Sequence, residues 1–244
     1  MDKIKQLTDI INNSENIVFF GGAGVSTESG IPDFRSQDGL YNMKYDYSPE
    51  TILSHSFFMS NTKEFYRFYR DKMITDAVPN DAHKALYLLE KQGKLSAIVT
   101  QNIDGLHQAA GSKKVFELHG SIHRNYCMSC HKFFDLSAIK NSTDIPRCDC
   151  GGIIKPDVVL YEEGLDSETL YGSIDAIQNA DTLIIGGTSL NVYPAAGLIS
   201  AFKGRHLIVI NKSATPQDKN AELVISEPIG KTLKTAMQEL NRWD

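Results

Sequence analysis

The sequence lacks several features that would place it in other protein classes. Its 244 residues carry 25 Lys and Arg against 30 Asp and Glu, so it has no excess of the positive charge that general binding to nucleic acid or anionic membranes requires. No apolar run approaches the roughly 18 residues of a membrane-spanning helix. Residues 1–7, MDKIKQL, are charged from Asp2 onward and lack the pattern of a secretory signal peptide. We therefore expect a cytoplasmic protein with neither nucleic-acid nor membrane partners.

Cysteine is scarce, and its few positions are grouped. The four cysteines form a C-x-x-C pair, Cys127 and Cys130, and a C-x-C pair, Cys148 and Cys150, with 17 residues between the pairs. In a reducing compartment such cysteines are metal ligands or free thiols more often than disulfides. Four thiolates from two turns predict a closed tetrahedral zinc site, structural because no coordination position is left for a substrate. Four unligated cysteines remain the alternative.

Short apolar runs predict the fold class. Runs typical of buried parallel strands occupy residues 17–20, 96–100, 115–118, 182–186, 207–210 and 223–226. Helical patterns lie between several of them, at 81–92 for example, and at both ends of the chain, at 4–11 and 229–240. Such alternation predicts an α/β fold, a Rossmann-like parallel sheet with helices on both faces.

Two stretches interrupt this alternation. We predict that residues 1–35, 81–120 and 156–244 form the Rossmann-like domain. The aromatic-rich residues 36–80 are expected to form a helical module, and residues 121–155, which hold the cysteines, a zinc-ribbon module. Together these two modules would form a smaller, discontinuous domain.

The turn after the first strand lacks the complete dinucleotide fingerprint. It reads GGAGVSTESGIPDFR, residues 21–35, and the sixth position counted from Gly22 is Thr27 instead of glycine. Gly22, Ala23 and Gly24 still allow the backbone to approach a pyrophosphate and to direct N–H groups toward it. This turn is therefore a candidate nucleotide-binding site, although the residues that follow its first two glycines depart from the dinucleotide fingerprint.

Three further strand ends carry polar side chains. The segments are TQNIDGLH (100–107), ELHG (117–120) and GGTSLNVYP (186–194). Because ligands of open parallel sheets bind beyond the carboxyl ends of strands, these segments should line one crevice with the glycine turn. As alternatives, Asn102 and Asp104 could merely cap the following helix, and His119 could be a hydrogen-bonded core histidine.

Taken together, these segments resemble the sirtuin family of NAD-dependent protein-lysine deacylases. The resemblance spans nearly the whole chain and rests on GAGVS (22–26), GIPDFR (30–35), TQNID (100–104), HG (119–120), the cysteine module, KPDVVLYEE (155–163), GTSL (187–190) and IN (210–211). It implies NAD as co-substrate, one structural Zn²⁺ per chain, and acetylated-lysine proteins or peptides as partners. The implied reaction removes the acetyl group and releases nicotinamide and O-acetyl-ADP-ribose.

The resemblance also implies roles for individual residues. His119 would be the general base and Asn102 would order the ribose and a water, which makes these two the predicted catalytic residues. Asp104 with Ile103 would hold the nicotinamide carboxamide, and Phe34 would shield the reactive face. The predicted cofactor-binding residues are Gly22, Ala23, Gly24, Thr27, Phe34, Arg35, Gln101, Asn102, Ile103, Asp104, His119, Gly187, Thr188, Ser189 and Asn211. The predicted substrate-binding residues are Val158, Val159, Tyr161, Leu190 and Val192.

Some family features are missing. Family members that prefer succinyl or malonyl lysine carry Tyr-x-x-Arg, whereas here Tyr66 is followed by Tyr69, and Arg70 comes one residue too late. We expect Arg70 to point away from Tyr66, and acetyl-lysine to be preferred. Glu162 stands where the family has glycine. ADP-ribosyl transfer at the same site and a non-catalytic NAD-sensing zinc scaffold remain alternative functions.

Overall fold

Two sheets organise the chain, which the computed structural model describes over residues 2–33 and 47–243. The larger sheet has six parallel strands in the order β3-β2-β1-β7-β8-β9. They are β1 (Ile17–Gly21), β2 (Leu95–Thr100), β3 (Val115–Glu117), β7 (Thr182–Gly186), β8 (His206–Ile210) and β9 (Leu223–Ile225). The strand order reverses at β1, as in dinucleotide-binding sheets. The predicted Rossmann-like class is confirmed, and each predicted strand lies within one residue of its observed bounds.

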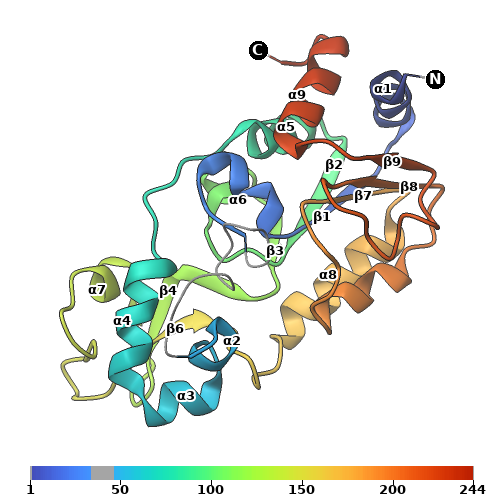
Figure 1. Ribbon diagram of the computed structural model, residues 1–244. Coiled ribbons are helices and arrows are strands. Elements are labelled where there is room, and N and C mark those ends of the chain that lie inside the picture. Colours follow the sequence, from blue (N-terminus) through green and yellow to red (C-terminus); the bar gives the residue numbers. More distant parts are fainter. Residues whose placement is uncertain (1, 34–46, 244) are drawn as a thin grey trace.

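Both faces of this sheet are covered by helices, which explains why its strands are apolar without alternation. Phe19 and Phe20 are both fully buried, yet successive side chains of a strand point to opposite faces. Phe19 packs in the core formed with α1 (Lys3–Asn13), α5 (Asp81–Lys91) and α9 (Ile229–Glu239). Phe20 packs in the core formed with α8 (Ser167–Asn179) and the 3-10 segment η4 (Ala195–Ala201). Figure 1 shows α8 on one side of the sheet and α5 and α9 on the other.

The long helices begin at side chains suited to that position. Helix α1 (Lys3–Asn13) starts after Asp2, whose carboxylate accepts a hydrogen bond from the backbone N–H of Ile4. Asn80 caps α5 (Asp81–Lys91), and Asp166 caps α8 (Ser167–Asn179). The short α6 (Leu106–Ala109) and the last helix, α9 (Ile229–Glu239), complete the helices around the large sheet. Among the helices of the described ranges, none has the length and apolar character needed to cross a bilayer.

The remaining elements form a second, smaller body. Its antiparallel sheet has the order β5-β4-β6, with β4 at Gly120–Cys127, β5 at Phe133–Phe134 and β6 at Ile154–Val158. Its helices are α2 (Pro49–Ile52), α3 (His55–Ser60), α4 (Thr62–Lys72) and α7 (Ser137–Lys140). One aromatic core joins the α4 side chains Phe65 and Tyr66 to Ile122 and Ile154 of the sheet. Strand β6 continues past residue 155, so Val158 belongs to this sheet.

The chain passes from the large sheet to the small one at Gly120. Its φ of +76° favours glycine, and a Cβ there would lie 1.9 Å from the carbonyl oxygen of Asp157. Beside this crossing, Arg124 donates to Glu117 Oε2 at 2.6 Å and to Asp157 Oδ2 at 2.8 Å. One guanidinium thus connects β3 of the large sheet with β6 of the small sheet.

The buried histidines His83 and His107 predict how stability depends on pH. Their rings lie 4.8 Å apart, and burial lowers the pKa of His83 to about 4 and the pKa of His107 well below 6.5. The unfolded chain, with ordinary imidazole pKa values near 6.5, therefore binds more protons than the folded chain between pH 6.5 and about 4. The two neutral histidines therefore make their full contribution to the free energy of unfolding above pH 6.5, and this contribution should be lost as the pH falls from 6.5 to about 4.

We expect His83→Asn to flatten this dependence by at most about 1.4 kcal/mol per pH unit, because one titrating group is removed. The asparagine oxygen could still accept the hydrogen bond that His83 Nδ1 accepts from the Asn80 N–H. Urea unfolding of both proteins across this pH range measures the difference. Acid release of metal from the cysteines affects both proteins alike. Equal slopes in the two proteins would contradict the prediction.

Candidate active site and metal centre

The parallel register brings the predicted site segments to one edge of the large sheet. At the last residue of β1, Gly21 is opposite Thr100 on one side and Gly186 on the other, and Thr100 is opposite Glu117. The segments that leave β1, β2, β3 and β7 therefore start side by side, at the point where the strand order reverses. This is the place where open α/β sheets bind their ligands.

The glycine turn packs directly against the turn after β7. Gly24 donates its N–H to the carbonyl oxygen of Gly187 at 2.8 Å, and a Cβ on Gly24 would lie 2.8 Å from Gly187 Cα. A Cβ on Gly22 would lie 2.9 Å from Thr188 Cβ. Side chains at these two glycine positions would therefore push the two turns apart. The close contact leaves a bare backbone surface suited to a pyrophosphate.

The structure also explains why glycine is missing at Thr27. In the dinucleotide fingerprint the third glycine lets a long helix pack closely on the strand. Here two short 3-10 turns follow instead, η1 (Ala23–Val25) and η2 (Thr27–Ser29). The Thr27 hydroxyl donates to the Gly24 carbonyl at 3.0 Å and so stabilises the first of them. Predicted residues Phe34 and Arg35 lie outside the described residues.

Ser26 connects the two polar residues that follow β2. Its hydroxyl donates to Asp104 Oδ2 at 2.7 Å and accepts from Asn102 Nδ2 at 3.1 Å. Asp104 also contacts the start of the next helix, where Gly105 occupies the N-cap position, because its Oδ1 accepts from the Leu106 N–H at 2.9 Å. Asp104 therefore does more than cap the helix, since its other carboxylate oxygen binds Ser26. Ser26 lies within the GAGVS motif, but nothing in the local sequence indicates its contacts with Asn102 and Asp104.

His119 is held in one tautomer. Its Nδ1 lies 2.9 Å from the carbonyl oxygen of Gln101, and since a carbonyl can only accept, Nδ1 carries the proton. The neutral ring then keeps the Nε2 lone pair for accepting a proton. Burial lowers the pKa of His119, although the bond to Gln101 partly offsets this. The unprotonated form therefore predominates at neutral pH, as a general base requires.

The remaining predicted cofactor residues occupy the surrounding turns. Gln101 Nε2 donates to Thr188 Oγ1 at 3.1 Å, which links the β2 and β7 ends. Asn211, at the end of β8, donates to the Ser213 carbonyl at 2.7 Å. The Ile103 carbonyl accepts from the Ile122 N–H, and the Ile103 side chain packs against the small-domain core. These contacts place Gln101 and Thr188 closest to the glycine turn.

The predicted substrate edge joins three parts of the chain. The Val159 N–H donates to the carbonyl of His119 at 3.0 Å, which joins the predicted edge to the segment that follows β3. Tyr161 exchanges backbone bonds with Leu53 and His55 of the helical module. Val158 and Leu190 are buried, whereas the Tyr161 side chain is exposed and Val192 is half-buried.

Glu162, which departs from the family pattern, is held by the helical module. Its φ of +76° is the conformation that favours glycine. The two carboxylate oxygens accept from the backbone N–H and the hydroxyl of Ser56, at 2.9 and 3.0 Å. Next to it, Glu163 accepts from Lys155 Nζ at 3.1 Å and from the Leu160 N–H at 2.9 Å. Both carboxylates therefore stabilise the turn that ends the substrate edge.

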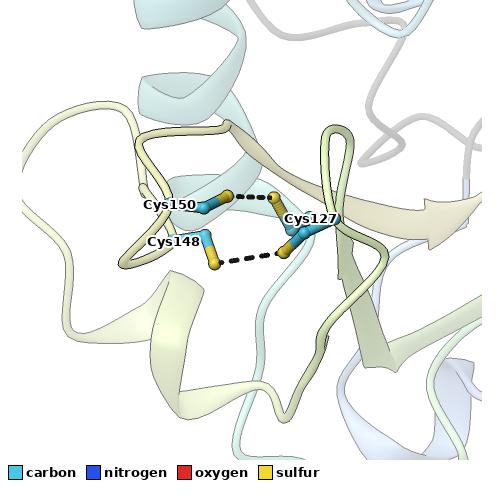
Figure 2. A group of neighbouring side chains, drawn as sticks. Cys127, Cys148 and Cys150 are labelled. Carbon is cyan, nitrogen blue, oxygen red and sulfur yellow. Dashed lines mark hydrogen bonds between the residues drawn. The ribbon is translucent and has the colours of Figure 1, made fainter.

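The four cysteines form a compact metal site. Their sulfur atoms all lie within 4.8 Å of one another, with Cys127 and Cys150 at 3.4 Å and Cys130 and Cys148 at 3.6 Å. Figure 2 shows the sulfur atoms facing one another across two turns. Tetrahedral zinc with bonds of about 2.3 Å places its sulfur ligands about 3.8 Å apart, which these contacts approach. Gly152 fits closely beneath, because a Cβ there would lie 2.6 Å from Cys127 Sγ.

Zinc content tests this centre. We expect one zinc per chain, and we expect Cys130→Ser to lose the metal and to lower the thermal midpoint, because structural zinc binding is coupled to folding. Cys130 is the better choice for replacement because it is exposed, whereas Cys127 and Cys148 are buried. Metal analysis and thermal unfolding of both proteins, purified without chelator, are the measurements. A zinc-free native protein, or unchanged stability in the variant, would contradict the assignment.

Comparisons with known proteins agree with this geometry. The Sir2 family model matches residues 22–194. NAD-dependent protein deacetylases of Clostridium acetobutylicum and Clostridium perfringens are 65% and 63% identical, over 97% and 95% of this chain and 99% and 97% of theirs. A solved complex of Sir2 with a p53 peptide and NAD+ has a TM-score of 0.88 at 39% identity, covering 98% of this chain and 99% of that one. The chain belongs to the Sir2 family.

Proposed function

We propose that this protein removes acetyl groups from protein lysines in a reaction that consumes NAD and yields nicotinamide and O-acetyl-ADP-ribose. The observation that carries the proposal is the position of His119. Its ring is fixed by Gln101 beside the cofactor turns, and its backbone carbonyl pairs with Val159 of the substrate edge. A solved Sir2 structure supports the proposed products, since it contains a deacetylated p53 peptide together with an acetyl ADP-ribose.

Each part of the site has a distinct task in this reaction. Bound NAD would supply a ribose whose C1′–nicotinamide bond breaks, and the acetyl oxygen of the substrate would take the place of nicotinamide at C1′. Attack of a ribose hydroxyl on the acetyl carbon, followed by water, would then release free lysine and leave the acetyl group on the ribose. The glycine turn offers backbone N–H groups to the pyrophosphate, and Asp104, oriented by Ser26, is placed to hold the nicotinamide amide. Asn102 presents a fixed side chain because Ser26 orients its amide as well. His119 Nε2 accepts a proton from a ribose hydroxyl, which makes that oxygen a nucleophile.

The acetylated lysine would enter between the two bodies of the protein. An extended peptide beside Val159 would add a strand to the edge formed by residues 158–163, which is a common mode of peptide recognition. The Val159 carbonyl would accept the hydrogen bond from the substrate side-chain amide. We propose a cytoplasmic location, where thiolate ligands remain reduced, and neither nucleic acid nor membrane as a partner.

Replacing His119 tests the proposed chemistry. We expect His119→Ala to lower deacetylation of an acetyl-lysine peptide by about 10²–10⁴-fold, the usual effect of losing a general base, while NAD still binds. In the unaltered protein, the acid limb of kcat/KM should lie below pH 6.5, because burial lowers the pKa of His119. Deacetylation kinetics and NAD calorimetry are the measurements.

A suitable control is His206→Ala. His206 starts β8 at the opposite end of the sheet, where its Nδ1 lies 2.6 Å from Glu222, and its loss should leave turnover nearly unchanged. Near-normal turnover of His119→Ala would show that the ring is only structural. No release of nicotinamide from NAD by the unaltered protein, with or without an acetylated peptide, would favour a non-catalytic NAD-binding scaffold.

Acyl preference follows from how α4 is held. The Tyr66 hydroxyl donates to the Ile154 carbonyl and so is not available to a distal carboxylate. Tyr69, at the position where the succinyl-preferring members carry arginine, is fully buried and offers no positive charge. The expectation that Arg70 points away from Tyr66 was wrong. Its guanidinium lies 5.8 Å from the Tyr66 ring centroid, because residues four apart share one helix face. Arg70 is nevertheless engaged, since it donates to Ser142 Oγ at 2.9 Å and the Asp144 carbonyl at 3.0 Å.

We therefore expect acetyl-lysine to be a much better substrate than succinyl-lysine, because a buried carboxylate without a cationic partner is costly. The measurement is kcat/KM on one peptide carrying either group at the same position. As a control, Arg70→Ala should leave the acetyl-to-succinyl ratio unchanged. Equal or better turnover of the succinyl peptide would contradict this assignment, and a ratio that changes in Arg70→Ala would show that Arg70 reaches the acyl group.

A further inference from the structure

The cofactor loop, residues 22–30, is held in place from outside by two helix starts. Its own turns η1 and η2 are three residues each and cannot fix their position alone. At the start of α9, the Gly230 N–H donates to Glu28 Oε1 at 2.7 Å. At the start of α5, Asn80 Nδ2 donates to the Val25 carbonyl at 2.8 Å and to Ser29 Oγ at 3.0 Å. The Asn80 amide thus contacts both turns of the loop.

The Asn80 side chain forms hydrogen bonds both to α5 and to the cofactor loop. Its Oδ1 accepts from the Ala82 N–H at 2.8 Å and so caps α5. Its own N–H donates to His83 Nδ1 at 3.2 Å, which completes a capping box. The helix therefore uses the oxygen and the backbone of Asn80, and the loop uses the amide nitrogen. Because α5 packs in the sheet core, the amide has a rigid support.

The segment held by Asn80 carries the groups that face the cofactor. Val25, whose carbonyl accepts from Asn80, lies between Gly24 of the backbone surface and Ser26, which orients Asn102 and Asp104. A displacement of Val25 would therefore move both neighbours. We infer that Asn80 is a positioning residue for NAD, acting through the amide nitrogen and independently of its capping of α5. This inference rests on the proposed function.

Replacing Asn80 by aspartate tests the contact with the loop separately from the capping of α5. Aspartate caps helices about as well as asparagine, and its charge is favourable at a helix start. It has no N–H to donate, so in Asn80→Asp the bond to the Val25 carbonyl is replaced by repulsion between two oxygens. The variant should keep α5 while releasing the loop. A purely structural role as a cap would leave NAD binding unaffected.

The experiment measures the Kd for NAD by calorimetry, without peptide, together with the thermal midpoint. Asn80→Asp should weaken NAD binding about three- to tenfold, the effect of losing one or two hydrogen bonds. Its thermal midpoint should stay near that of the unaltered protein. Its KM for an acetyl-lysine peptide at saturating NAD should stay within about twofold, because in the described part of the chain the hydrogen bonds of Asn80 go to α5 and to the cofactor loop and none goes to the substrate edge.

A matched control is Asn16→Asp. Asn16 lies just before β1, at the end of the strand away from the loop, and its Nδ2 donates to the Asn179 carbonyl at 2.8 Å. The same chemical change there removes the same kind of bond, and the Kd for NAD should not change. If both variants weaken NAD binding equally, general destabilisation is the cause and the inference fails. An unchanged Kd in Asn80→Asp would also overturn it.

Ser29→Ala keeps the test decisive if Asn80→Asp does not fold. It removes one of the two acceptors of the amide and leaves the cap of α5 intact. We expect about two- to threefold weaker NAD binding, and an unchanged Kd would overturn the inference. An unaltered protein that binds no NAD would instead contradict the proposed function, so the two failures are distinguishable.

Discussion

The close contact between two glycine turns determines the site. Gly24 and Gly187 are joined by a 2.8 Å hydrogen bond, and a Cβ on Gly187 would lie 2.3 Å from the Val25 nitrogen. Gly187 also has a φ of +59°, a backbone conformation that residues other than glycine rarely adopt. Because the ends of β1 and β7 approach this closely, the loop that follows β1 is directed over the neighbouring end of β2. There Ser26 meets Asn102 and Asp104.

A second constraint joins the cofactor side to the substrate side through one residue. His119 donates from its ring to Gln101 on the large sheet and accepts on its backbone from Val159 of the substrate edge. The next residue, Gly120, must be glycine for the chain to pass Asp157. Arg124 bridges Glu117 and Asp157 at the same crossing. His119, the proposed general base, is therefore fixed relative to both the cofactor turns and the predicted substrate edge, and a change of angle between the sheets would alter both contacts.

Much of this arrangement is predictable from sequence because local patterns carry it. The strands are apolar on both faces, and cysteine spacing indicates a metal site before any coordinates are known. Long-range contacts are different. Ser26 and Asn80 are ordinary polar residues whose partners lie 76 to 78 and 51 to 55 positions away. The predicted direction of Arg70 was wrong because it was based on the 100° rotation between Tyr69 and Arg70. The Arg70 side chain instead contacts Tyr66, which lies four residues earlier on the same helix face.

We propose that acetyl transfer to the ribose of NAD takes place beside His119. The most direct measurement is mass spectrometry of all products after one turnover with NAD and an acetyl-lysine peptide. We expect free lysine, nicotinamide and an ADP-ribose that carries the acetyl group, in equal amounts. Release of free acetate with NAD intact would contradict it, because the acetyl group would then have passed to water without the ribose.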